Sequence, residues 1–210
     1  MRTSENKTGI VIGQIRESSS LCESMAEQAE TIVEIADQMT RAFRRGNKVL
    51  LFGNGGSAAD AEHIAAELAG KFTLFRDPLP AVALTTNTAS LTAIGNDFGY
   101  EEVFARQLRG LAVKGDVAIG ISTSGASPNV IKAIEEANRR GAVTVAFTGA
   151  RGKLKESAQL VLSIPSTDTP RIQEAHMLAG HIICGLVEQS LFSAGQPAEP
   201  RTAMARAKRH

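Results

Sequence analysis

The sequence of 210 residues contains no tryptophan, and aromatic residues make up only 4% of it. Proteins that bind single-stranded nucleic acid stack bases on aromatic side chains, and these are too few here to build such a platform. The formal net charge at pH 7 is only +1, and the basic residues after position 194 account for more than this excess. The rest of the chain is not basic, so we predict no nucleic-acid partner.

Cysteine is equally scarce, because Cys22 and Cys184 are the only two in the chain. Two thiols are too few for a disulfide framework or a thiolate metal site, so both are expected to be reduced and structural. No apolar run approaches the roughly 18 residues of a membrane span, and the N-terminus does not resemble a signal peptide. We therefore predict a cytoplasmic protein with no membrane partner.

Hydrophobic residues make up 43% of the chain, enough for one well-buried domain. Within the N-terminal segment 1–46, an amphipathic pattern over 18–45 predicts one long helix, whereas residues 1–15 show no clear periodicity. Residues 194–210 are rich in Ala, Pro, Arg and Lys and are typical of a disordered basic tail. Residues 47–193, between these segments, show the alternating patterns of a folded α/β domain.

This central part predicts five strands and six helices. The strands are 48–52, 80–84, 116–121, 142–147 and 159–164, and the helices are 57–70, 88–94, 100–111, 128–140, 152–157 and 171–192. Strands that alternate with helices favour a parallel sheet covered on both faces, so we predict a doubly wound, three-layer α/β sandwich with a long N-terminal helix. The apolar stripe of that helix needs a partner, so segment 1–46 is expected to belong to the same domain and to form an oligomer interface.

The first chemical motif follows strand 48–52, where Gly53-Asn54-Gly55-Gly56-Ser57 leads into a helix. Glycines let the backbone turn tightly, and Ser57 is a candidate N-cap. The free N–H groups of a helix start attract anions, so the motif favours a sugar-phosphate site. An ordinary strand-to-helix turn is the alternative, since neither a complete dinucleotide-binding motif nor a P-loop motif is present.

A second loop has the same design. Strand 116–121 is followed by several hydroxyl residues and then by Pro128, which suits the first turn of a helix. The hydroxyls belong to Ser122, Thr123, Ser124 and Ser127. Donors that converge in this way favour a phosphate ligand, and a helix-capping loop without a ligand is the alternative. Because ligands of open parallel sheets lie at the carboxyl ends of strands, the two loops are expected to share one ligand.

Polar side chains on the helices provide the rest of the candidate site. His63 and Glu67 lie four residues apart and project from one helix face, as a metal pair, an acid–base pair or a surface ion pair would. The last helix contributes His181, which is either a hydrogen-bonded core residue or a ligand. Between these sources, Asn96 and Asp97 stand beside two glycines and suit either sugar hydroxyls or a capping turn.

Five motifs, in order and in spacing, resemble the phosphoheptose isomerase family, which has the sugar isomerase (SIS) fold. They are Gly-Asn-Gly-Gly-Ser at 53–57, His63 with Glu67, Gly-Asn-Asp-Phe-Gly at 95–99, Ser-Thr-Ser-Gly at 122–125, and Arg-Ile-Gln-Glu at 171–174 with His181. The resemblance covers residues 30–193 and implies a cytoplasmic homotetramer with one zinc ion per subunit. It also implies an isomerase that converts sedoheptulose 7-phosphate to D-glycero-D-manno-heptose 7-phosphate, the first step toward ADP-heptose and the lipopolysaccharide core.

The same resemblance implies roles for individual residues. Substrate binding would involve Asn54, Gly55, Gly56, Ser57, Glu67, Asn96, Asp97, Ser122, Thr123, Ser124, Ser127 and Gln173, and zinc would bind His63, Glu67, Gln173 and His181. For an enediol mechanism we assign Glu67 as the base at carbon and His181 as the group that handles oxygen protons. A zinc-bound carboxylate is a poorer base, so either Glu67 leaves the metal when substrate binds or another group moves the protons.

Gln173 poses a geometric question. It precedes His181 by eight residues, about 12 Å along an unbroken helix, and its side chain leans away from His181. Either Gln173 lies before the regular helix or neighbouring subunits share the site.

Two rival functions also stay open. One is a non-catalytic SIS scaffold that binds the bacterial replication initiator, although such a relative lacks counterparts of Glu67 and His181. The other is a sugar-phosphate sensor, which usually carries a DNA-binding domain. The 46 residues before the first strand offer one long helix and no clear helix-turn-helix for that role.

Overall fold

A five-stranded parallel sheet lies at the centre of the computed structural model, which describes residues 2–192 and, for side chains, residues 7–192. The strand order is β2-β1-β3-β4-β5. The strands are β1 (Val49–Gly53), β2 (Ala81–Ala83), β3 (Val117–Ser122), β4 (Val143–Thr148) and β5 (Leu160–Ser163). The predicted parallel α/β architecture is confirmed, whereas the tail predicted at 194–210 lies outside the described residues.

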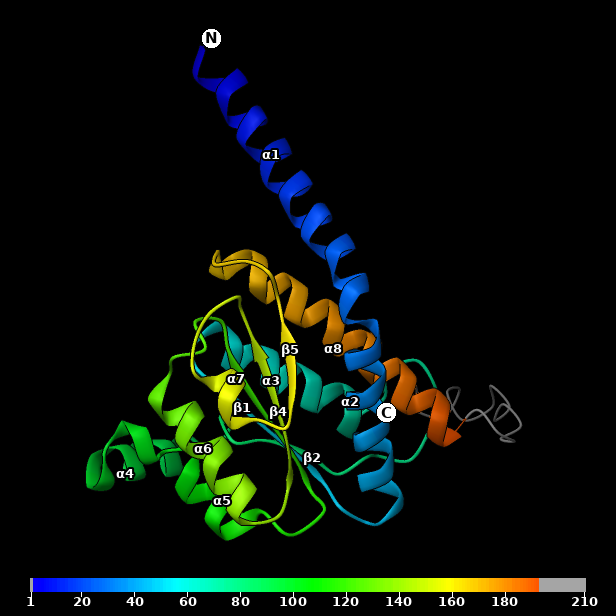
Figure 1. The fold of residues 1–210 in the computed structure, drawn as a ribbon, viewed down its shortest axis with the longest axis vertical. Coiled ribbons are helices and arrows are strands. Elements are labelled where there is room, and N and C mark those ends of the chain that lie inside the picture. The colour runs from blue at the N-terminus through cyan, green and yellow to red at the C-terminus, as the bar shows by residue number, and fades with distance from the viewer. Residues whose placement is uncertain (1, 193–210) are drawn as a thin grey trace, which may run out of the picture.

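Helices cover both faces of this sheet, as a doubly wound fold requires (Figure 1). One face carries α2 (Ala29–Arg44), α3 (Gly56–Ala69) and α8 (Thr169–Phe192), and the other carries α5 (Ala105–Leu111) and α6 (Pro128–Arg139). Successive strand residues point to opposite faces, so Leu51 joins the core under the first group while Leu50 and Phe52 join the core under the second. The three-layer prediction is therefore correct.

The N-terminal segment differs from the prediction in two respects. The helix α1 (Arg2–Ser24) includes residues 2–15, for which no helix was predicted. The single helix predicted over 18–45 is divided by a 3-10 turn, η1 (Met25–Gln28), into the end of α1 and α2. The apolar side chains of Ile10, Ile12 and Ile15 on α1 are exposed, and the helix projects beyond the sheet (Figure 1). Because this helix has few contacts with the core of its own chain, its sequence lacks the core-facing pattern from which helices are predicted.

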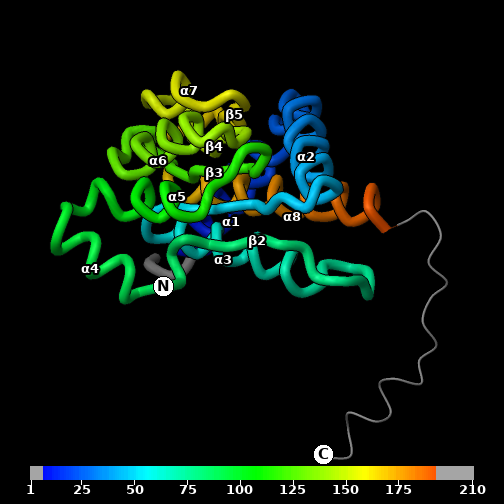
Figure 2. Tube along the Cα trace, turned by 90° about the horizontal axis from the view of Figure 1, so that it is seen from below, coloured from blue at the N-terminus to red at the C-terminus, as the bar shows by residue number. Residues whose placement is uncertain are grey.

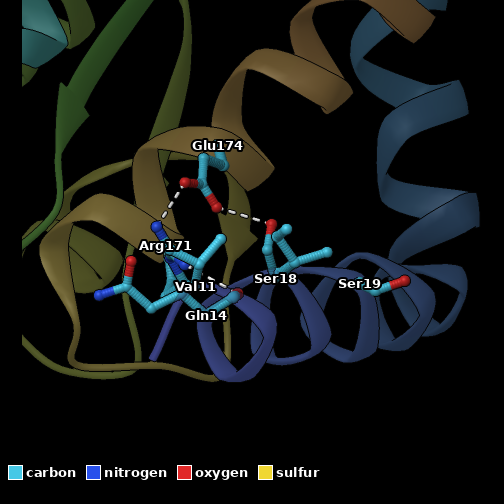
Figure 3. Close-up of a pocket in the computed structure, with 7 residues that line it drawn as sticks. Val11, Gln14, Ser18, Ser19, Arg171 and Glu174 are labelled. Carbon is cyan, nitrogen blue, oxygen red and sulfur yellow. Dashed lines mark hydrogen bonds and ion pairs between the residues drawn. The ribbon is translucent and has the colours of Figure 1, made fainter. Parts of the chain in front are cut away.

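Polar contacts join α1 to the beginning of α8 (Figure 3). The Arg171 guanidinium donates to the Gln14 carbonyl oxygen at 2.9 Å and to a Glu174 carboxylate oxygen at 2.6 Å. The Ser18 hydroxyl donates to the other Glu174 oxygen at 2.6 Å. These residues line a cleft between the two helices and tie the N-terminal segment to the helix that carries His181.

The remaining elements are α4 (Thr88–Phe98), η2 (Tyr100–Glu102) and α7 (Leu154–Ser157). No residue of α4 is buried, and this helix protrudes at one side of the molecule (Figure 2). It continues past its predicted end and includes Asn96 and Asp97, because the glycine with the positive φ that ends it is Gly99. The helix predicted over 100–111 begins as η2 and becomes α-helical only at Ala105. Among residues 2–192, no helix is long and apolar enough to cross a membrane.

Candidate active site

The glycine loop, residues 53–57, lies at the carboxyl end of β1, beside β3, where the strand order reverses. Open α/β sheets bind ligands at such a switch point. Gly55 has a φ of 56° and is the N-cap of α3, so the helix begins one residue before Ser57, and the predicted Ser57 cap is wrong. Gly53 allows close packing, because a Cβ there would lie 2.7 Å from the Ser57 carbonyl oxygen and 2.9 Å from that of Ile121.

The serine loop, residues 122–127, occupies the equivalent place at the end of β3. Pro128 is the first residue of α6, as predicted, and Ser127 is its N-cap. The Ser122 hydroxyl lies 3.0 Å from that of Ser127 and 3.4 Å from that of Ser124. Three hydroxyls thus converge at the start of α6, an arrangement that suits a phosphate group. The side chain of Thr123, the fourth hydroxyl residue, is half-buried.

A pair of asparagines joins the two loops. Asn54 and Asn129 exchange two hydrogen bonds of 2.9 Å, in which each Nδ2 donates to the other Oδ1. The Tyr100 hydroxyl donates a further bond of 3.2 Å to Asn54 Oδ1, which brings the end of α4 beside the glycine loop. Sequence reasoning named Asn54 but missed Asn129, whose place in the first turn of α6 was the available signal.

Asn96 and Asp97 lie on the last turn of α4, before the segment that reaches Asn54 through Tyr100. Both side chains are exposed, and Asn96 Nδ2 donates to Asp97 Oδ1 at 2.8 Å. Their exposure leaves them available to a ligand, and their role in substrate binding stays a prediction.

Three titratable side chains converge between α3 and α8. His63 Nε2 lies 3.0 Å from His181 Nε2 and 3.3 Å from Glu67 Oε1, and one ligand atom from each residue lies within 4.8 Å of the others. Two ligands bound 2.0–2.1 Å from a tetrahedral zinc ion lie about 3.3 Å apart. The two imidazoles and the carboxylate therefore suit a small divalent metal ion in both chemistry and spacing. We call these three residues the His-Glu-His cluster.

The close contact of α3 with α8 brings this cluster together. A Cβ at Gly180 would lie 2.8 Å from Ile64 Cδ1, so a larger residue there would require the Ile64 side chain to move. The His181 ring packs 5.0 Å from the His63 ring and 5.7 Å from the Phe72 ring, measured between centroids. His63 is exposed and His181 is half-buried, so a ligand can reach the cluster from solvent.

Gln173 lies apart from the cluster within one chain. It falls inside α8, which begins at Thr169, so the expectation that it precedes the regular helix is wrong. Its amide packs against Gly56, because a Cβ there would lie 2.9 Å from Gln173 Oε1. His63 follows Gly56 by seven residues, about 10 Å along α3. The remaining explanation is a neighbouring subunit that supplies Gln173, and its role as a ligand stays a prediction.

Other titratable groups near the site are buried. Burial raises the pKa of Asp60 to about 6, against the opposing effect of His63. Burial lowers the pKa of His176 to about 4, and its Nε2 lies 3.4 Å from the Thr148 carbonyl oxygen, so this histidine is a neutral core residue at pH 7. Burial also raises the pKa of Cys184 to about 12 and leaves its free thiol inert, in agreement with a structural role.

The fold and the site together define a SIS-domain protein, and a family model of the SIS domain matches residues 15–149. The phosphoheptose isomerase of Burkholderia pseudomallei strain 1710b is 56% identical over 163 residues, which cover 77% of this chain and 83% of that one. The phosphoheptose isomerase of Aquifex aeolicus is 53% identical over 176 residues, with coverages of 83% and 92%.

Solved structures agree with these relatives. The phosphoheptose isomerase of Neisseria gonorrhoeae has a TM-score of 0.82 at 41% identity, and the match covers 87% of this chain and 98% of that chain. The present chain belongs to the phosphoheptose isomerase family and is an isomerase. The two rival functions, a replication-initiator scaffold and a sugar-phosphate sensor, are not favoured by these relatives.

Proposed function

We propose that this chain converts sedoheptulose 7-phosphate to D-glycero-D-manno-heptose 7-phosphate through an enediol. The observation that carries the proposal is the arrangement of α3, which begins at the glycine loop and bears His63 two turns later. The phosphate would bind between the glycine loop and the serine loop, with its sugar chain extended along α3 toward the His-Glu-His cluster. Seven residues of helix, about 10 Å, are on the scale of a seven-carbon sugar phosphate.

The reaction requires C1 and the O1 hydroxyl each to lose a proton, while C2 and the carbonyl oxygen O2 each gain one. Glu67, the half-buried carboxylate of the cluster, acts as the base at carbon. His181 transfers the oxygen protons while its imidazole is not bound to metal, because a free imidazole can both accept and donate a proton. The Phe72 and His63 rings both pack against the His181 imidazole and restrict its movement.

Zinc is the proposed cofactor, one ion per subunit, bound by the His-Glu-His cluster with Gln173 of a neighbouring subunit as the fourth ligand. When bound, zinc polarises the substrate carbonyl and stabilises negative charge on its oxygen. Glu67 then serves as the carbon base if it moves off the ion as substrate binds. If Glu67 stays a ligand, another group at the site takes that role.

The assembly proposed for the chain is a cytoplasmic homotetramer. Side chains of α1, η1, α2 and α8 line an open apolar groove, and a second copy would bury it. The groove is lined by Cys22, Met25, Ala26, Ala29, Ile32, Val33, Leu178, Ile182 and Leu186. Contact through this groove and through the exposed residues of α1 would make segment 1–46 the oligomer interface. In this assembly the enzyme would supply the heptose precursor of ADP-heptose and lipopolysaccharide.

The test is aldose formation from sedoheptulose 7-phosphate by purified protein, before chelation, after chelation and after return of zinc. The proposal expects turnover that is lost on chelation and restored by zinc. Turnover that survives complete removal of metal would exclude a catalytic role for zinc. Absence of turnover in folded, zinc-loaded tetramer would exclude the proposed reaction and favour the scaffold function.

A further inference from the structure

A buried ion pair lies beside the His-Glu-His cluster and joins the two elements that carry it. Arg76 Nε lies 2.9 Å from Glu188 Oε1, and each side chain is only 1% exposed. Arg76 belongs to the connection between α3 and β2, and Glu188 lies on α8, seven residues after His181. Neither residue forms part of the motifs by which the sequence resembles its family.

The Glu188 carboxylate organises the segment that follows α3. It accepts hydrogen bonds from the backbone N–H groups of Phe72 at 3.2 Å, Thr73 at 2.8 Å and Leu74 at 2.8 Å, and from the Thr73 hydroxyl at 2.6 Å. Burial alone would raise the pKa of Glu188, but these bonds and the one from Arg76 outweigh it and lower the pKa to about 2. The carboxylate therefore stays ionised and holds this segment against α8.

The Arg76 guanidinium binds the end of α3. It donates from Nη2 to the Glu67 carbonyl oxygen at 2.9 Å and from Nη1 to the Leu68 carbonyl oxygen at 2.9 Å. The same Nη1 lies 3.3 Å from the Gly70 carbonyl oxygen. The last carbonyl groups of a helix lack hydrogen-bond donors within that helix, and the Arg76 guanidinium provides the donors here. It thus binds the backbone of Glu67, a member of the cluster.

We propose that Arg76 and Glu188 are positioning residues that set the separation of Glu67 from His181, and thereby the affinity of the cluster for a divalent metal ion. Arg76 binds the Glu67 backbone, and Glu188 of α8 binds both Arg76 and the backbone of residues 72–74. Phe72 adds a direct link, because its N–H binds Glu188 while its ring packs 5.7 Å from the His181 ring. The inference rests on the metal site of the proposed function.

The test is the Zn²⁺ affinity of metal-free protein, measured by titration calorimetry for wild type, Arg76→Lys and Glu188→Gln. Lysine keeps the charge, but its three donors lie on one nitrogen and cannot reproduce the bonds that Arg76 makes from Nε, Nη1 and Nη2. Glutamine keeps one acceptor oxygen but loses the charge. Loss of the groups that orient metal ligands weakens metal binding by about 10- to 100-fold. We expect at least a tenfold loss of affinity in both variants.

Asp116→Asn is the matched control. Asp116 is fully buried and pairs with Lys48 at 2.7 Å. Its carboxylate accepts hydrogen bonds from Asn47, Lys48 and Val113, and from no residue of α3, α8 or the connection 70–80. The control should lower the thermal unfolding temperature and leave Zn²⁺ affinity unchanged within about twofold, because the Asp116 carboxylate shares no hydrogen bond with the residues that hold the cluster. Each titration is run well below the unfolding temperature of the variant.

The outcomes separate this inference from the proposed metal site. Wild-type affinity in folded Arg76→Lys and Glu188→Gln would overturn the positioning role, and so would an equal loss in the control. If neither variant folds, Thr73→Val removes only the hydroxyl donor to Glu188, and we then expect a loss of about threefold. An unchanged affinity there would again overturn the role. In contrast, wild-type protein that binds no Zn²⁺, or binding that His63→Ala leaves intact, would refute the metal site itself.

Discussion

Acid should destabilise this protein in part through Glu188. Burial favours the neutral form of this carboxyl, but hydrogen bonds from Thr73, Leu74 and Arg76 outweigh burial and lower its pKa from 4.5 to about 2. A carboxyl with a lowered folded-state pKa contributes stability that is fully present above pH 4.5 and is lost as the pH falls toward 2. One pKa unit corresponds to about 1.4 kcal/mol, so the contribution at pH 7 is about 3 kcal/mol.

The measurement is the free energy of unfolding in urea for metal-free wild type and Glu188→Gln, at pH 7 and at pH 3. At pH 7 we expect the variant to be less stable by about 3 kcal/mol, because Arg76 loses its charged partner in a buried setting. At pH 3 the difference should shrink by about 2 kcal/mol, because protonation of the wild-type carboxyl favours the unfolded state. Other carboxyls titrate in both proteins and cancel in the comparison. A difference that is the same at both pH values would refute the ionised, hydrogen-bonded state of Glu188.

Gly53→Ala should lower the free energy of unfolding by about 2 kcal/mol or more, because its Cβ would lie 2.7 Å from the Ser57 carbonyl oxygen. The control Gly110→Ala should cause no such loss, because a Cβ there would lie in open space. Urea unfolding of the two variants measures the difference. Asn129→Ala should raise the KM for sugar phosphate about tenfold with a smaller effect on kcat, because the two loops lose their shared hydrogen bonds. Steady-state kinetics that show only a kcat loss would contradict this. Excess Zn²⁺ should raise the thermal unfolding temperature of wild type and not of His63→Ala, and an equal shift in both would argue against the cluster as the binding site.

The fold could be predicted from the sequence where local pattern and burial agree. The strand that ends at Phe52 is an apolar run, and the structure buries it in the middle of a parallel sheet. The helix over residues 2–15 of α1 was not predicted, because its apolar residues do not face a core and so show no helical periodicity. Ile10 and Ile15, for example, are exposed. Prediction also failed at the end of the helix expected over 88–94, which continues through Gly95 to Phe98 and ends at Gly99, where the backbone adopts a positive φ.

The parts of the site that depend on local sequence spacing could also be predicted. His63 and Glu67 share a helix face by spacing alone, and hydroxyl residues after a strand indicate a ligand loop at once. Contacts between distant segments leave no such local trace. Arg76 and Glu188 are 112 residues apart, and nothing near either residue in sequence shows that their charges meet in the interior. The location of Gln173 likewise depends on how α3 and α8 pack, which helical spacing does not determine.

The most direct test of the account is the kcat for isomerisation of sedoheptulose 7-phosphate by zinc-loaded wild type, Glu67→Gln and His181→Ala. General acid–base groups contribute about 100- to 10,000-fold to a rate, so each variant should lose at least about 100-fold in kcat while it keeps the wild-type fold by circular dichroism. If wild type turns over the substrate and both folded variants retain that rate, the assignment of proton transfer to the His-Glu-His cluster is contradicted.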